Sequence, residues 1–194
     1  MTPRVIAIGG SAGAIDVLRL ILPVLPSGFE PSVMVTVHVP ENRPSLLASI
    51  FADQCRLPVS EADDKQPLMR GTIVFAPPGY HLLVESNATL ALANDEPVYW
   101  SRPSIDVMFH AVAEAFRASA VGVLLTGASH DGADGLARIK ATGGKVIVQD
   151  PETCVADTMP RAGIAKAKPE LVLSPHAIAR YLSTLGTQSE QELA

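Results

Sequence analysis

Three polar residues in short segments that follow apolar runs carry the side chains that a nucleophilic mechanism uses. Ser11 lies in the pentapeptide 9–13, which reads Gly-x-Ser-x-Gly, while His38 and Asp131 follow later runs. Glycines on both sides let a serine sit exposed on a tight turn. An imidazole can take the serine proton near neutral pH, and a carboxylate can hold the ring in the required tautomer. Together these residue types suggest attack on an ester or amide carbonyl.

Each of these residues also has a simpler interpretation. Ser11 could cap a helix or belong to a phosphate-binding turn, although Ile8 stands where a dinucleotide fingerprint needs glycine and no Walker lysine follows. His38 could be a hydrogen-bonded loop histidine, and Asp131 could cap a helix that starts at Gly132. A non-catalytic phosphate- or nucleotide-binding module therefore stays open at this point.

Other titratable residues compete for the same roles. His130 directly precedes Asp131, so we expect its side chain to point elsewhere. Asp106 and Asp134 fall inside predicted helices, where surface or salt-bridge roles are expected. Asp150 ends a strand and is the more serious rival to Asp131 as the carboxylate.

The elements that would position these residues alternate along the chain. Apolar runs predict strands at 4–8, 33–37, 71–79, 121–125, 145–149 and 171–173. Helical spacing predicts helices at 15–25, 44–55, 104–116, 132–141, 160–165 and 175–185, with Ser104 as an N-cap. The residues around Ser86-Asn87 predict a hairpin from 81–84 and 89–92.

This alternation predicts one α/β domain, a doubly wound, mostly parallel sheet flanked by helices, with a small antiparallel hairpin near residues 81–92. Ligands bind such sheets beyond the carboxyl ends of the strands. The clusters that follow the strands at 9–13, 38–40 and 126–132 are therefore expected to meet at one edge.

Composition narrows the function class. The 194 residues carry a net charge of −5 without a basic run, so we expect no nucleic-acid partner. No apolar run has the length of a secretory signal or a membrane span, which predicts a cytoplasmic protein without membrane insertion. Cys55 and Cys154 form no CxxC pair, so we expect buried, inert thiols and no structural metal.

Several segments together resemble the catalytic domain of the bacterial chemotaxis protein-glutamate methylesterases (CheB-type). The likeness runs in order from about Val5 to Leu182. It includes the turn at Ser11, His38 before Pro40, the Ala-Pro-x-Gly segment followed by His81, 102–109, 122–127 with 131–133, Gln149-Asp150, and Met159-Pro160 with Ala162. Several motifs in one order are more specific than any single motif.

The resemblance implies a function and a site. In the family, the residues that match Ser11, His38 and Asp131 form the catalytic triad, which demethylates glutamate methyl esters on the cytoplasmic helices of chemoreceptors, releases methanol and also deamidates receptor glutamines. The family uses no metal or cofactor. For this chain we add backbone amides near Ala12, Gly127 and Ala128 as candidate oxyanion donors.

The sequence departs from the family pattern at two loops. Ala14 replaces the second glycine of Ser-x-Gly-Gly, and Ala128-Ser129 replaces Met-Gly in the loop that borders the reacting carbonyl, so a hydrolase of the same fold acting on another ester or amide is the alternative. We expect residues 1–187 to form the catalytic domain and 188–194 a polar tail. A receiver segment is not seen before the first strand, so we expect constitutive competence, with control left to abundance, a separate regulatory partner or receptor conformation.

Overall fold

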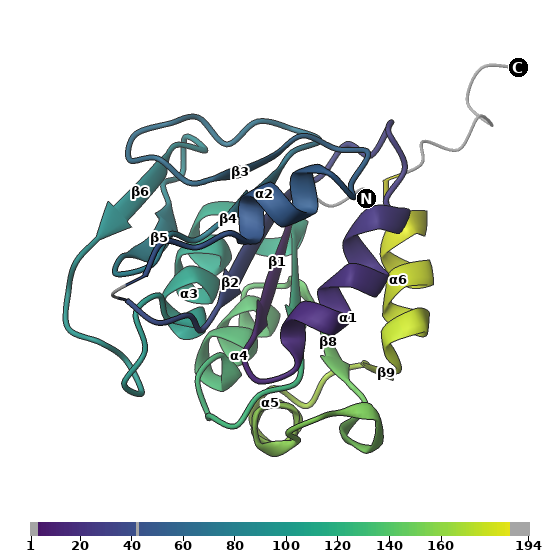
Figure 1. The fold of residues 1–194 in the computed structure, drawn as a ribbon. Helices are drawn as coiled ribbons and strands as arrows, with labels where there is room; N and C mark the ends of the chain where they lie inside the picture. Colours follow the sequence, from purple (N-terminus) through teal and green to yellow (C-terminus); the bar gives the residue numbers. More distant parts are fainter. Residues whose placement is uncertain (1–3, 42, 187–194) are drawn as a thin grey trace, which may run out of the picture.

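The computed structural model describes residues 4–41 and 43–186, and the predicted tail at 188–194 lies outside these residues. Seven strands form one parallel sheet in the order β3-β4-β2-β1-β7-β8-β9 (Figure 1). Their bounds are β1 Val5–Gly10, β2 Ser32–Val37, β3 Val59–Glu61, β4 Ile73–Phe75, β7 Ala120–Leu124, β8 Lys145–Gln149 and β9 Leu171–Leu173. The predicted doubly wound α/β fold is confirmed.

Helices cover both faces of this sheet because its central strands are buried on both sides. In β1, Val5 and Ala7 pack into one core cluster while Ile6 and Ile8 pack into the other. The second cluster contains residues of α1 Ala14–Ile21, α2 Leu47–Ala52 and α6 Pro175–Thr184. The first contains residues of α3 Ile105–Phe116, α4 Ala133–Ala141 and α5 Thr158–Ala167, on the opposite face (Figure 1). Short 3-10 turns occur at Leu22–Val24, Arg117–Ser119 and Pro151–Thr153.

The predicted hairpin is confirmed as β5 His81–Val84 paired antiparallel with β6 Leu90–Ala93. It forms its own two-stranded sheet rather than extending the parallel one. Leu82, Val84 and Leu90 join the core cluster that contains the buried face of α3. The hairpin therefore places His81 against the beginning of α3.

Several local predictions differ from the structure, among them the strand predicted at 71–79, which is limited to β4 Ile73–Phe75. Helix α2 begins at Leu47 and not at Pro44, since the Ser45 hydroxyl accepts a hydrogen bond from the Leu47 amide at 3.2 Å and the chain turns there. Strand β3 was not predicted, because its three residues are largely exposed and offer no apolar run. Among the described residues, every helix is too short or too polar to cross a membrane.

The direction of winding reverses at the central strand. From β1 the chain moves to β2 and β4 on one side, then crosses through α3 to β7 and β8 on the other. Strands β1 and β7 pair in parallel, so the loops that follow them leave from the same edge toward opposite faces. Ser11 follows β1, His38 follows β2 and the loop 126–132 follows β7, as the sequence predicted.

Candidate active site

The turn that carries Ser11 is fixed to the loop after β7. The Ser11 amide donates to the Thr126 carbonyl at 2.9 Å, and the Thr126 hydroxyl donates to the Ala12 carbonyl at 2.9 Å. Gly13 then adopts φ 82°, a conformation that an L side chain rarely takes, and helix α1 starts at the next residue. The Gly-x-Ser-x-Gly pattern thus produces a sharp strand-to-helix turn with a half-buried serine.

The end of β2 brings His38 beside this turn. Gly10 and Val37 are register partners in the parallel pair, and the His38 amide donates to the Gly10 carbonyl at 3.3 Å. The backbones of Ser11 and His38 therefore continue from neighbouring positions of adjacent strands. Among the described residues, neither the Ser11 hydroxyl nor the Nδ1 atom of His38 has a hydrogen-bond partner.

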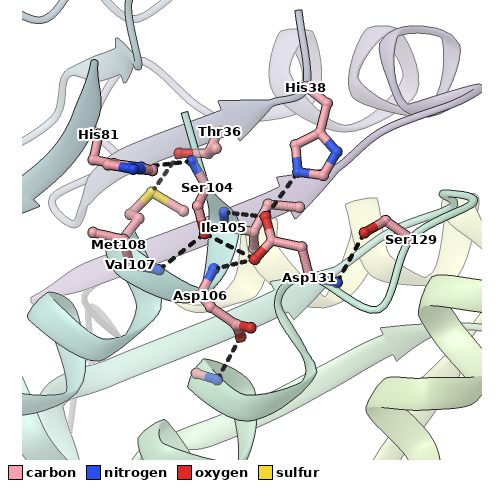
Figure 2. A network of polar contacts seen from close by, with 11 residues as sticks. Thr36, His38, His81, Ser104, Ile105, Asp106, Val107, Met108, Ser129 and Asp131 are labelled. Atoms are coloured by element: carbon pink, nitrogen blue, oxygen red, sulfur yellow. Dashed lines mark hydrogen bonds and ion pairs between the residues drawn. The ribbon is translucent and has the colours of Figure 1, made fainter. Parts of the chain in front are cut away.

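The carboxylate of Asp131 is paired with the Nε2 atom of the His38 imidazole. Figure 2 shows the contact between His38 Nε2 and Asp131 Oδ2, which lie 2.8 Å apart. The carboxylate is fully buried, while the imidazole is 12% exposed. Asp131 also accepts hydrogen bonds from the Ser104 hydroxyl at 2.9 Å and the amides of Ile105 and Asp106 at 2.7 and 2.9 Å. The carboxylate thus sits at the N-terminus of α3, where the helix dipole favours negative charge.

The protonation state of this pair follows from its surroundings. Burial acts to raise the pKa of Asp131, but hydrogen bonds from His38 and from the amides of Asp106 and Ile105 outweigh it and lower that pKa. Because an ionised carboxylate only accepts hydrogen bonds, Nε2 of His38 carries the proton. Nδ1 is then the unprotonated nitrogen, available as a base.

The rival residues lie elsewhere. The His130 ring packs against Tyr99, with centroids 6.5 Å apart, as expected for a side chain that points away from Asp131. Asp134 forms an ion pair with Lys166, and Asp150 accepts a hydrogen bond from the Glu152 amide at 3.1 Å.

Asp106 differs from its predicted surface or salt-bridge role. It is buried, and its side chain accepts a hydrogen bond from the Gly135 amide of α4 at 2.7 Å. Burial raises the pKa of Asp106 to about 6. The hydrogen bond from the Gly135 amide acts to lower this pKa, while the nearby negative charge of Asp131 acts to raise it further. The prediction was wrong because α4 packs over this face of α3, which the helical pattern alone does not indicate.

Backbone amides near Ser11 decide where an oxyanion could bind. The Gly127 amide donates to the Ala156 carbonyl at 2.9 Å and is engaged in this structure. Among the described residues, the amides of Ala12 and Ala128 have no hydrogen-bond partner. Of the three predicted donors, Ala12 and Ala128 are therefore the two whose amides are available.

Cys55 and Cys154 are free thiols that are half-buried, not buried as predicted. Burial raises the pKa of Cys55 and of Cys154 to about 11, so both stay thiols at neutral pH. Within residues 4–41 and 43–186, no group of three His, Cys, Asp or Glu side chains is arranged to hold a metal ion.

A family model described as CheB methylesterase matches residues 6–182, which include Ser11, His38 and Asp131. The chain belongs to this family. The resemblance predicted from the sequence motifs is therefore confirmed.

Individual relatives agree with the CheB family assignment. A Leptospira interrogans protein provisionally named protein-glutamate methylesterase/protein-glutamine glutaminase is 39% identical over 185 residues, which cover 95% of this chain and 96% of that protein. The protein-glutamate methylesterase/protein-glutamine glutaminase of Symbiobacterium thermophilum is 36% identical over 176 residues, 91% of this chain and 49% of the relative. The chain thus spans nearly all of the first relative and about half of the second.

A solved CheB structure has the same fold. The crystal structure of the Thermotoga maritima CheB methylesterase catalytic domain superposes with a TM-score of 0.90 at 30% sequence identity. The match covers 95% of this chain and the whole of that domain.

Sequence reasoning missed the surroundings of Asp131. The hydrogen-bond donors Ser104, Ile105 and Asp106 lie at the start of α3. Ser104 precedes Asp131 by 27 residues in the chain. Ser104 was predicted as an N-cap, and its hydroxyl does accept a hydrogen bond from the Val107 amide. That cap was the one available signal, and it did not indicate which carboxylate the helix would receive.

Proposed function

We propose that this chain is a serine hydrolase that demethylates glutamate methyl esters on the cytoplasmic helices of chemoreceptors, and that it also deamidates receptor glutamines. One observation carries the proposal: His38 is paired with the buried carboxylate of Asp131 at the sheet edge where the Ser11 turn follows β1. Family membership and the names of its relatives support the substrate. We place this reaction in the cytoplasm, with the receptor as the macromolecular partner.

In this mechanism, Ser11 Oγ attacks the ester carbonyl while Nδ1 of His38 takes its proton. The charge that forms on the carbonyl oxygen is stabilised by the amides of Ala12 and Ala128, each such donor being worth roughly 3 kcal/mol. His38 then gives its proton to the departing methoxide, so methanol leaves and an acyl-enzyme on Ser11 remains. Asp131 holds the Nε2–H tautomer and stabilises the imidazolium throughout.

Water completes the cycle. His38 removes a proton from water, the hydroxide adds to the acyl carbon, and Ser11 leaves with that proton to give glutamate. A glutamine substrate follows the same path with ammonia as the leaving group.

The loop at Ala128 and Ser129 supports a second candidate, a hydrolase of the same fold that acts on another ester or amide. The Ser129 hydroxyl accepts a hydrogen bond from the Asp131 amide at 3.1 Å, a contact beside the site that the glycine of a Met-Gly loop has no side chain to make. Methanol release from methylated receptor fragments, measured beside turnover of generic small esters, separates the candidates. Efficient turnover of small esters without receptor demethylation would refute the first.

A further inference from the structure

Both oxygens of Asp131 are fully engaged, and most of the donors come from the start of α3. Oδ1 accepts from the Ser104 hydroxyl and the Asp106 amide, while Oδ2 accepts from the Ile105 amide and His38 Nε2. Figure 2 shows these contacts converging on the carboxylate. Two backbone amides are fixed by the helix itself, so within the described part of the chain the Ser104 hydroxyl is the one side-chain donor besides His38.

The direction of the Ser104 hydroxyl proton follows from its other contact. The Val107 amide donates to Ser104 Oγ at 3.4 Å, so that side of the oxygen serves as an acceptor. The proton is left to point at Asp131 Oδ1, 2.9 Å away. Ser104 is completely buried, so water does not compete for either contact. The residue caps α3 and donates to the carboxylate at once.

The backbone of Ser104 is in turn fixed by a hydrogen bond to His81, a residue that takes no part in the proposed reaction itself. His81 Nδ1 lies 3.1 Å from the Ser104 amide and Nε2 lies 3.2 Å from the Glu96 carbonyl. An amide N–H only donates, so Nδ1 accepts from Ser104 and carries no proton. A carbonyl only accepts, so Nε2 carries the proton and donates it to Glu96. The imidazole is 1% exposed. One defined tautomer therefore links the hairpin to the start of α3.

We propose that Ser104 is a positioning residue that acts through Asp131, and that His81 fixes the Ser104 backbone for this purpose. The proposal rests on the proposed hydrolase function. Without the hydroxyl, Oδ1 keeps only the Asp106 amide as a donor, so the plane of the carboxylate is less constrained and the lone pair of Oδ2 is held less firmly toward His38. The bond that sets the His38 tautomer then loses its fixed geometry.

The first test replaces the hydroxyl. Ser104→Ala should lower kcat for methyl-ester hydrolysis by about 10- to 100-fold with little change in KM, as expected when a reacting group is slightly misplaced. In Ser104→Ala the negative charge of Asp131 has one hydrogen-bond donor fewer, so it should attract a proton on the neighbouring imidazole more strongly. The fall of kcat/KM on acidification should therefore begin at a higher pH than in the unmodified chain. Ser104→Thr keeps the hydroxyl and should recover most of the lost kcat.

A stability control separates positioning from folding. Ile178→Val trims a fully buried side chain of α6, whose cluster lies on the other face of the sheet, and should lose stability to an extent similar to loss of the α3 cap. It should leave kcat and the pH profile unchanged. Equal losses of kcat in Ser104→Ala and Ile178→Val, or equal losses in the Ala and Thr variants, would overturn the proposal.

The His81 arm uses two isosteric replacements. His81→Asn places an acceptor near the Nδ1 position and should keep most of the activity, while His81→Gln places its amide nearer to the Nε2 position and should resemble Ser104→Ala. The reverse order would contradict a role through the Ser104 amide.

A readout without substrate distinguishes this proposal from the function it rests on. Long-range ¹H–¹⁵N NMR of His38 should show the Nε2–H tautomer in the unmodified chain and a mixture in Ser104→Ala. If the chain proves inactive on methylated receptors, the proposed function fails, but the NMR comparison still decides the positioning role. An unchanged His38 tautomer in Ser104→Ala, together with unchanged kinetics on any ester that the chain hydrolyses, would refute it.

Discussion

Replacing Asp131 by asparagine tests the most constrained group of the site. Four donors surround the carboxylate, two at each oxygen, and one donor on each side is a backbone amide. Asparagine supplies one acceptor oxygen and one NH₂ group. In either orientation the NH₂ group therefore faces a backbone N–H, that of Ile105 or that of Asp106.

Both orientations of the asparagine have a cost for stability and for catalysis. A buried donor without an acceptor costs about 1–3 kcal/mol of unfolding free energy. With the NH₂ group toward Ile105 and His38, the imidazole must accept at Nε2 and so carries its proton on Nδ1, where the base is needed. With the NH₂ group toward Ser104, the tautomer survives but the charge opposite the imidazolium is lost. By analogy with other triads, kcat should fall on the order of 10⁴-fold.

The assay measures methanol release from a methylated receptor fragment and, separately, urea unfolding of each variant. Asp150→Asn is the matched control, since Asp150 is the rival carboxylate and an amide oxygen can still accept from the Glu152 amide. This control should keep full activity. An Asp131→Asn variant within about tenfold of the unmodified chain, or an inactive Asp150→Asn variant, would refute the assignment of Asp131.

Two further predictions follow from the same region. Burial and the neighbouring Asp131 charge raise the pKa of Asp106 to about 6, so the folded state binds more protons than the unfolded state between about pH 4 and 6, and stability falls as pH rises through that window. Urea unfolding should show this group adding on the order of 1 kcal/mol at pH ~5 relative to pH ~7.5, a difference that Asp106→Asn should lack; identical pH dependence in both chains would contradict it. A Cβ at Gly127 would lie 2.7 Å from Met159 Cε and 3.0 Å from Ser11 Cβ, so Gly127→Ala should reduce kcat by about 10-fold or more by shifting the serine. Gly28→Ala, where a Cβ meets nothing within 4 Å, should not; equal effects of the two would contradict it.

The sequence was sufficient to predict the parts of the fold that depend on local patterns. Strands β1, β2 and β7 are buried on both faces, and their unbroken apolar runs indicate parallel strands directly. The carboxyl ends of those strands then placed Ser11, His38 and Asp131 at one edge. Strand β3 lacked such a run, since it is a short, exposed edge strand.

The surroundings of the site could not be predicted because they depend on contacts between distant segments. Asp131 was as compatible with capping α4 as with a catalytic role, and its side chain in fact reaches the start of α3. The same packing buries Asp106, which the helical pattern placed at the surface. Likewise, the engagement of the Gly127 amide depends on Ala156, which belongs to the loop before α5.

Nucleophilic catalysis by Ser11 with His38 as its base is decided by methanol release from a methylated receptor fragment, measured for Ser11→Ala, His38→Ala and the double variant. Each single change should remove nearly all hydrolysis, and the double variant should lose little more, because triad members act as a unit. Circular dichroism and urea unfolding should show all three variants folded. Substantial methanol release by folded Ser11→Ala, or a double variant far slower than either single variant, would contradict nucleophilic catalysis by Ser11 with His38 as its base.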